Sequence, residues 1–506
     1  MAITVDRENR IPAYIQIRNQ LREQILRGDL PRGTRLPPER KMAQSLGVSR
    51  TTVVSAYDEL AAEGLVEARV GRGTLIATPP SGLTERGSGV RPLAWTAHMT
   101  NLAKRLQGEK PAGLYALAEL CNRADLAQLC NGVPDSSLLP LDRIRQACEA
   151  VLRESAVAAV SAGAKHGIAP LREVIASRLA RAGIASDADR VVVINGAQQG
   201  FDLLVRLLTE PGDTVIVESP TYLGAIDTFQ AEGLRVIGIP VDRDGMDVDQ
   251  AEFVVARYRP RFIYTVPTFQ NPTGTTMSLE RREKLLGIAR RYQVPIIEDD
   301  PFGDLYFDEP PPPRLKALDG SGHVLYLGTV SKVLASGLRV GWLVAPQPVV
   351  EAAARLKALS DSQPVSLSQH LVLEFMGRGW LDEHVDTMRA IYASRYRAMD
   401  AALRRHLPRE ASWTPPGGGI SMWVELPQQV GAQELLDAAA PRGVVFLPGH
   451  YLYPGGGPSN TCRLNFSVPD EHEIGRGVEA MGSALRQVMR RRTQAPAERA
   501  VPGPIA

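Results

Sequence analysis

Lys332 lies in an environment where a free lysine is unexpected. It belongs to the segment GTVSKVLASGLRVGW, residues 328–342, and follows the apolar run HVLYLG. Burying an ammonium ion among small and apolar residues is costly, so the charge must be either solvated or removed. A Schiff base with an aldehyde would remove it, so a phosphorylated aldehyde cofactor is one candidate partner for Lys332.

Such a cofactor requires further groups of defined chemistry. A carboxylate must keep the ring nitrogen protonated, so that the ring can act as an electron sink. A helix N-terminus with an arginine suits the phosphate, an aromatic side chain can cover the ring, and a second arginine can hold an amino-acid carboxylate. The chain offers these groups in four segments: NGAQQGFDLL (195–204), ESPTYLG (218–224), PTFQNPTG (267–274) and VPIIEDDPFGD (294–304).

Each segment taken alone has a more ordinary interpretation. Many strand-to-helix loops contain glycine, and Tyr222 alone is more often a packed or surface tyrosine. The acidic run 298–300 is also typical of a metal site or a solvated turn, although no His or Cys accompanies it. An isolated lysine is usually a surface residue. The workable order of all these segments favours the cofactor site.

The elements that must position these residues form an alternating pattern from about residue 95 to 490. Helical stretches separate the strand-like runs RVVVI, TVIVE, RVIGIP, RFIYTV, VPIIED and HVLYLG. This alternation predicts a mostly parallel sheet covered by helices. Ligand groups collect at the carboxyl ends of parallel strands, where several of the candidate residues lie.

The first 78 residues have a different pattern, typical of a DNA-binding unit. Apolar residues at helical spacing predict a helix that ends at Gly28, followed by a helix (38–46), a turn and a second helix (49–63). Two short strands joined at 71–73 follow. Helix-turn-helix proteins read the major groove with the N-terminal residues of their second helix.

That placement predicts specific DNA contacts. Arg50 could reach a guanine edge or a phosphate, Thr51 and Thr52 could contact phosphate, and Arg72 could enter the minor groove. The alternative is a protein-interaction module with solvated charges, because 12 Lys or Arg against 9 Asp or Glu give a modest net charge of +3.

Length and composition predict several domains and a globular class. At 506 residues the chain is too long for one ordinary core. Its net charge of +2 is near neutral, so overall charge gives no reason to expect that the chain binds a polyanion such as DNA. The absence of an apolar signal core and of an 18-residue apolar run predicts a soluble cytoplasmic protein without a membrane span. Four cysteines without a CxxC pair predict neither a metal site nor a disulfide framework.

The expected domains are a DNA-binding domain (1–78), a linker and lead-in (79–112), a cofactor domain (113–492) and a disordered tail (493–506). The linker is assigned to 79–91, which is rich in Pro, Gly and Ser. A flexible chain of that length spans about 20 Å.

Two resemblances follow from these motifs. The first resemblance is to the winged helix-turn-helix of GntR-type bacterial regulators, carried by LPPER, GVSRTTV, ELAAEGL and GRGT. It implies DNA contacts from Arg40, Arg50, Thr52 and the wing around Gly71 to Gly73. The second resemblance is to the fold-type I, class I/II aminotransferases that use pyridoxal 5′-phosphate. It is carried by the segments NGVPDSSLLP, KHGIAPLR, NGAQQG, ESPTY, NPTG, EDD, GLRVGW, PPGGGISMWVELP and CRLNFS. Together they resemble the MocR subfamily, whose α+β winged helix precedes an α/β aminotransferase-like domain with a small C-terminal subdomain.

The resemblance implies a role for each matching residue. Lys332 forms the Schiff base, and Asp299 rather than Asp300 faces the ring nitrogen. Asn271 bonds the ring hydroxyl, Tyr222 stacks on the ring, and the phosphate is held by Ala197, Gln198, Thr329, Ser331 and Arg339. Arg463 holds the ligand carboxylate, and Gly132 borders the ligand.

Two positions depart from the family pattern. Phe302 stands where the family commonly has a tyrosine that donates to the ring hydroxyl, and Ala162 is the nearest fit to an aromatic residue that reaches the partner subunit's phosphate. The first departure should alter the cofactor pKa and slow the chemistry. Neither removes cofactor binding.

The combination predicts a homodimeric transcription regulator. It would bind a double-stranded DNA operator through two heads, and its large domain would sense an amino acid, an amine or the cofactor itself. Closure on a ligand would then be coupled reciprocally to DNA binding. Two alternatives stay open: a working aminotransferase with a secondary DNA-binding head, and a cofactor-free dimerisation platform.

Overall fold

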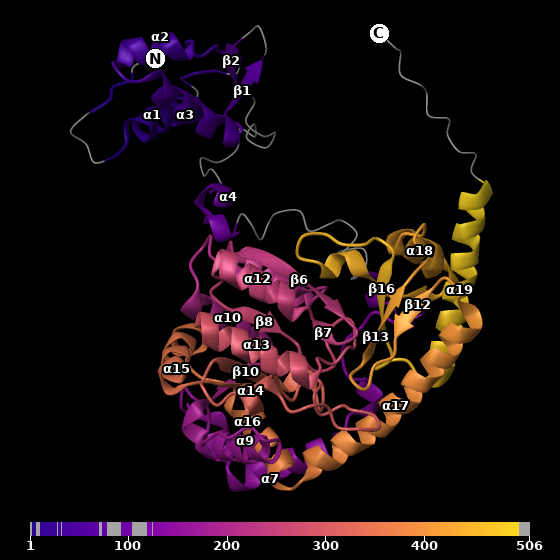
Figure 1. Cartoon of the computed structure of the whole chain (residues 1–506). Helices are drawn as coiled ribbons and strands as arrows, with labels where there is room; N and C mark the ends of the chain where they lie inside the picture. Colours follow the sequence, from indigo (N-terminus) through magenta and orange to yellow (C-terminus); the bar gives the residue numbers. More distant parts are fainter. Residues whose placement is uncertain are drawn as a thin grey trace. The chain divides into compact units, whose positions relative to one another are not determined.

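The computed structural model divides into two compact units, Met1–Trp95 and Thr96–Ala506 (Figure 1). The structure describes residues 3–6, 11–27, 29–31, 33–69, 73–77, 93–103, 119–123 and 125–494. The linker predicted at 79–91, the wing residue Arg72 and residues 495–506 of the predicted tail (493–506) lie outside the described residues. The first two residues of that predicted tail, Thr493 and Gln494, are instead helical.

The first unit is a three-helix domain with a hairpin. Its elements are α1 (Ala13–Arg27), α2 (Glu39–Leu46), α3 (Arg50–Ala62), β1 (Val66–Arg69) and β2 (Gly73–Ile76). Gly47 ends α2 in the left-handed region, at φ 63°, and Ser49 caps α3 by accepting from the Thr52 N–H. The two helices of the predicted helix-turn-helix are therefore confirmed, joined by a short turn.

The second unit is built on an eight-stranded sheet. The strands, in spatial order, are β4 (Val191–Ile194), β11 (Gly341–Val344), β10 (Val324–Thr329), β9 (Ile296–Asp300), β8 (Ile263–Thr265), β5 (Thr214–Ser219), β6 (Arg235–Asp242) and β7 (Gly245–Met246). Only β11 and β7 run antiparallel to their neighbours. The predicted mostly parallel sheet is confirmed. Its central strands are almost wholly buried because helices cover both faces, and their polar residues are concentrated toward the carboxyl ends.

Alternate residues along the strands show which helices cover which face. Val192 and Ile194 pack with α10 (Ala197–Leu208), α11 (Leu223–Ala231) and α15 (Gln347–Asp361), whereas Val191 and Val193 point to the opposite face. That opposite face packs against α9 (Ala169–Arg181), α12 (Val248–Tyr258) and α13 (Leu279–Tyr292). Each strand therefore ends between two helical layers, and its last residues project beyond them.

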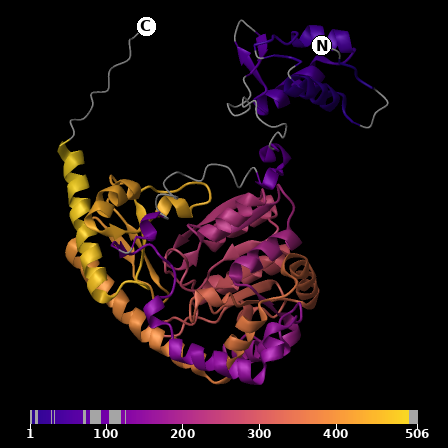
Figure 2. The ribbon, with the colours of Figure 1, turned by 180° about the vertical axis from the view of Figure 1, so that it is seen from behind.

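A smaller four-stranded sheet forms the C-terminal part of this unit. Its order is β12 (Ser412–Thr414), β13 (Ser421–Glu425), β16 (Thr461–Asn465) and β15 (Leu447–Pro448). Helix α17 (Trp380–His406) has 27 residues, about 40 Å, and runs from the large sheet to the small one. Figures 1 and 2 show α17 and α19 (Glu471–Gln494) side by side on the outside of the unit.

One prediction about the cysteines is wrong. Cys121 and Cys130, which lie on either side of β3 (Ala127–Gln128) in the sequence, are joined in a disulfide with a sequence separation of 9. β3 pairs with β14 (Val444–Val445). Cys148 and Cys462 are free. No helix of the described residues is long and apolar enough to cross a membrane.

Gly200 sets the distance between α10 and the sheet. A Cβ there would lie 2.5 Å from Cδ2 of Leu327 and 2.9 Å from Cδ1 of Ile194, whereas a Cβ at Gly287 in α13 would meet nothing within 4 Å. We therefore expect Gly200→Ala to lower the free energy of unfolding by about 1–3 kcal/mol through overpacking. Gly287→Ala, the matched control, should raise it by about 1 kcal/mol. Urea unfolding measures both; equal changes for the two variants would contradict the close approach.

Candidate functional site

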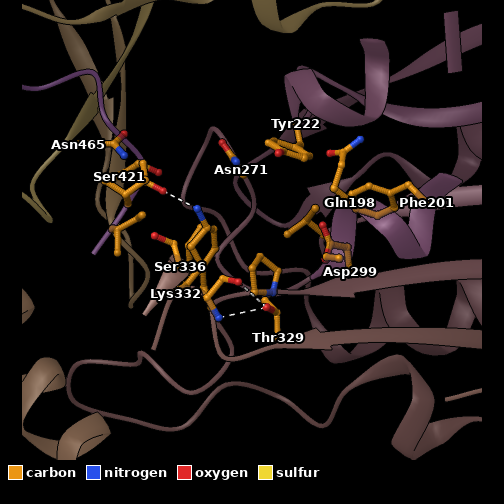
Figure 3. Close-up of a pocket in the computed structure, with 18 of the residues that line it drawn as sticks. Gln198, Phe201, Tyr222, Asn271, Asp299, Thr329, Lys332, Ser336, Ser421 and Asn465 are labelled. Atoms are coloured by element: carbon orange, nitrogen blue, oxygen red, sulfur yellow. Dashed lines mark hydrogen bonds between the residues drawn. The ribbon is translucent and has the colours of Figure 1, made fainter. Parts of the chain in front are cut away.

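A cavity of about 380 Å³ lies between the carboxyl ends of the large-sheet strands and the small sheet. Figure 3 shows Gln198, Tyr222 and Asp299 on one side of it and Ser421 and Asn465 on the other. The structure brings all the predicted cofactor and ligand residues to this cavity: Gly132, Ala197, Gln198, Tyr222, Asn271, Asp299, Thr329, Ser331, Lys332, Arg339 and Arg463.

Lys332 directly follows β10 and its turn. Its Nζ donates to the carbonyl of Gly132 at 2.5 Å. Burial and the nearby Arg463 guanidinium lower the pKa of the Lys332 ammonium to about 8, with Asp299 opposing the shift. A lysine with such a pKa is partly unprotonated near neutral pH, which is the state that attacks an aldehyde.

Asp299 is the acidic residue of β9 that reaches the cavity. Its Oδ2 accepts from the Tyr264 hydroxyl at 2.9 Å, while its Oδ1 is buried with no partner among the described residues. Burial raises the pKa of Asp299 to about 7. Its neighbours on the strand point elsewhere: Glu298 accepts from the backbone N–H of Leu315, and Asp300 pairs with Arg314 at 3.0 Å.

A turn with the geometry that suits an anion forms where β4 meets α10. Gly196, at φ 84°, precedes the first helical residue Ala197, and the Arg339 guanidinium donates to the carbonyl of Asn195 at 3.0 Å. A Cβ at Gly196 would collide with that guanidinium. Free N–H groups at a helix N-terminus beside an arginine suit a phosphate.

Two hydroxyls complete this turn, and a buried ion pair braces it. The Thr329 hydroxyl donates to Ser331 Oγ at 2.9 Å. Behind the turn, Asp361 accepts from Asn195 Nδ2 and Gln199 Nε2, both at 2.7 Å. Lys357, whose side chain is fully buried, holds Asp361 at 3.0 Å. The brace fixes the residues on either side of Gly196 and Ala197.

Arg463 occupies the opposite wall of the cavity, on β16. It donates to Asn271 Oδ1 at 3.0 Å and to the carbonyl of Cys130 at 2.9 Å. Its Nε is buried with no partner among the residues described, and burial lowers the pKa of its guanidinium to about 10. An anionic ligand group would satisfy this donor.

The two predicted departures differ in their position. Phe302 is 3% exposed and lines the cavity without a donor, whereas Ala162 is exposed and lies outside the lining. The lining also includes residues that the sequence did not single out: Val133, Phe201, Val266, Pro301, Ser336, Ile420, Ser421 and Asn465. Asn465 was predictable, because residues two apart on a strand share a face with Arg463.

The first unit has a surface hollow lined by Arg35, Arg40, Arg50, Gly73 and Thr74, among other residues. Arg50 pairs with Glu39 at 2.9 Å. The Arg35 guanidinium lies against Gly73, where a Cβ would be 2.9 Å from its Nε. Arg35 was missed because it precedes the helix-turn-helix in sequence and reaches the hairpin only through the fold.

The predicted threonine contacts have different environments. Thr51 is exposed at the start of α3, whereas the Thr52 hydroxyl lies 2.8 Å from the capping Ser49 hydroxyl. Thr52 therefore also serves the helix cap.

Comparisons with known proteins agree with both units. Residues 124–481 match the family "Aminotransferase class I and II", and residues 13–76 match "Bacterial regulatory proteins, gntR family". The HTH-type transcriptional regulator YisV of Bacillus subtilis (strain 168) is 32% identical over 484 residues, 96% of this chain and 98% of that protein. The probable rhizopine catabolism regulatory protein MocR of Rhizobium meliloti is 31% identical over 487 residues, 96% of each chain.

The chain belongs to the MocR-type regulators of the GntR family. The predicted family is thus confirmed. The second unit of this MocR-type regulator resembles LysN, the alpha-aminoadipate aminotransferase of Thermus thermophilus, in complex with N-(5'-phosphopyridoxyl)-L-leucine. The TM-score is 0.73 at 33% identity, and the match covers 79% of this chain and all of that chain. The helix-turn-helix unit implies DNA binding.

The lowered pKa of Lys332 predicts its reactivity in the cofactor-free protein. Because the neutral amine is the reactive form, acetylation of Lys332 by a pulse of acetic anhydride should be half-maximal near pH 8. The exposed Lys284 is the control: Asp249 raises its pKa, so it should react only at higher pH. Peptide mass spectrometry measures both; a Lys332 profile that coincides with that of Lys284 would contradict the assignment.

Proposed function

We propose that this MocR-type regulator binds pyridoxal 5′-phosphate through Lys332, and that an amino acid or amine entering the same cavity changes DNA binding by the head. The observation that carries the proposal is a buried lysine amine facing a buried carboxylate whose Oδ1 lacks a partner among the described residues, in a chain that also has a GntR-type head. A cytoplasmic location follows from this role.

The residues of the cavity fit the cofactor. Asp299 Oδ1 would accept from the protonated ring nitrogen, Tyr222 would cover the ring, and Asn271 would bond the ring hydroxyl. The turn at Ala197, with Arg339, would hold the phosphate. When bound, pyridoxal phosphate supplies an electron sink for the carbon atom attached to the ligand's amine.

Arg463 would bind the carboxylate of an amino-acid ligand. Its Nε is the donor that has no partner among the described residues, and a bidentate carboxylate could also displace Asn271 from the guanidinium. In the LysN complex leucine is joined to the phosphopyridoxyl group, and this supports an amino acid as the ligand class. The nature of its side chain stays open.

A homodimer would give this regulator two DNA-reading heads. An exposed apolar patch supports it: Val157 and Val160 of α8 (Ala156–Val160) are 77% and 73% exposed, and Val365 and Leu367 at the start of α16 (Ser366–Gly377) are 52% and 38% exposed. Apolar side chains gathered on a surface are typical of an interface. If ligand binding changes how the heads meet two half-sites, DNA must change ligand affinity by the same factor.

A working aminotransferase is the second candidate function. Lys332, once released, has a pKa near 8 and could carry a proton between ligand atoms. The cofactor-free platform is disfavoured, because a buried carboxylate oxygen without a partner costs free energy that a dimerisation module has no reason to spend.

Single-turnover absorbance separates regulator from enzyme. The holoprotein is mixed with a panel of amino acids and amines in the absence of a keto acid. We expect a ligand-dependent change in the visible spectrum without accumulation of pyridoxamine phosphate. Formation of pyridoxamine phosphate would instead favour the aminotransferase.

Lys332→Ala should abolish covalent cofactor attachment. We expect no visible absorbance from lysine-bound pyridoxal phosphate and no borohydride-reducible mass adduct. Lys284→Ala, which removes an exposed lysine paired with Asp249, should keep both signals. A persistent adduct in Lys332→Ala would refute the assignment.

Arg50→Ala should weaken operator binding while leaving the cofactor spectrum intact. Loss of a base or phosphate contact predicts a loss of about 1–3 kcal/mol at fixed salt. The operator is first selected from genomic fragments with the wild-type protein. Arg22→Ala is the matched control, because it also removes an exposed ion pair of the head, with Glu63 at 2.8 Å. Equal affinities for the two variants would exclude Arg50 from the interface.

A further inference from the structure

We propose that Tyr264 is a positioning residue, which directs Asp299 Oδ1 at the ring nitrogen of the cofactor; this inference rests on the proposed function. Tyr264 lies on β8, is fully buried and does not line the cavity. It acts only through Asp299.

The strand register brings the two side chains together. β8 and β9 are parallel neighbours, and Tyr264 is paired with Ile297. Asp299 lies two residues beyond Ile297, so its side chain is on the same face of the sheet, one step closer to the carboxyl end. The long tyrosine side chain spans that step, and its hydroxyl meets Asp299 Oδ2 at 2.9 Å.

Aromatic packing fixes the direction of this hydroxyl. The Tyr264 ring makes edge contacts with Phe201 at 5.4 Å and Phe229 at 5.7 Å between centroids. Phe201 itself lines the cavity and lies 6.2 Å from Tyr222, which would cover the cofactor ring. These ring contacts hold the phenol in place, so Asp299 Oδ2 stays occupied by its hydroxyl. Oδ1 of the same residue, which lines the cavity, has no partner among the described residues.

The same bond favours the charged carboxylate. Burial raises the pKa of Asp299, and the charges of Asp300 and Glu218 add to this, whereas the Tyr264 hydrogen bond and Lys332 oppose it. An ionised carboxylate can only accept hydrogen bonds, so it accepts the one that the Tyr264 hydroxyl donates. Without the hydroxyl, the proton shared between Asp299 and the ring nitrogen should move toward Asp299.

The chain contains a matched control on β10, the other neighbour of β9. Tyr326 of β10 is also buried, and its hydroxyl donates to Asp300 at 2.9 Å. Asp300 pairs with Arg314 and does not line the cavity. Tyr326→Phe therefore removes an equivalent hydroxyl from the adjacent carboxylate, away from the cofactor ring.

The experiment uses the full chain reconstituted with ring-¹⁵N pyridoxal phosphate. Tyr264→Phe should move the ¹⁵N chemical shift from the pyridinium toward the neutral pyridine value, and should weaken cofactor binding by about 10-fold or more. Tyr326→Phe should match the wild type in both. A wild-type shift in Tyr264→Phe, or equal shifts in both variants, would overturn the positioning role.

A further substitution guards against a folding defect of Tyr264→Phe. Incorporation of 3-fluorotyrosine at position 264 keeps the ring packing and makes the hydroxyl a stronger donor, so the ¹⁵N shift should stay at or beyond the wild-type pyridinium value. A shift toward neutral pyridine would refute the proposal. If the wild-type protein forms no adduct with pyridoxal phosphate, the proposed function itself fails, which is distinct from failure of the Tyr264 role.

Discussion

The constraint on which the cavity depends is the burial of charged side chains, both acidic and basic, beside the carboxyl ends of the large-sheet strands. Lys332, Asp299 and Arg463 are removed from water within the same space, and burial shifts the pKa of each toward its neutral form. Every such group needs a polar partner, because an unpaired charge in a protein interior is costly. The carbonyl of Gly132, the Tyr264 hydroxyl and the Asn271 amide provide those partners.

The residues proposed to contact the cofactor and ligand come from two sheets. The large sheet carries the amine of Lys332 and the turn at Gly196 and Ala197, whereas the small sheet carries Arg463 and Asn465. Helix α17 joins these two parts of the unit in a single element. An amino acid whose amine end is held on the large-sheet side and whose carboxylate is held by Arg463 would therefore bridge the two sheets. The kind of ligand bound could then change how the two sheets are positioned relative to each other.

The sequence predicted the fold class and located the cavity, but not the second layer of residues. The strand runs, the helix-turn-helix and the residues around Lys332 were readable because motif and periodicity are local. Tyr264 and Asp361 were not, because their roles depend on which strands are neighbours and on where α15 ends. The Cys121–Cys130 disulfide was missed for the same reason: spacing alone does not show that two cysteines nine positions apart lie together in space.

Because Gly196 and the Arg339 side chain approach each other closely, a substitution at one position is tolerated only together with a change at the other. Any side chain at 196 would have to displace the guanidinium, and a smaller residue at 339 would remove both the obstacle and the donor to the Asn195 carbonyl. A mutant library that varies either position alone samples mostly damaged turns. Engineering of this turn toward another anionic cofactor would have to sample 196 and 339 jointly, and a double-mutant cycle between them should be strongly non-additive.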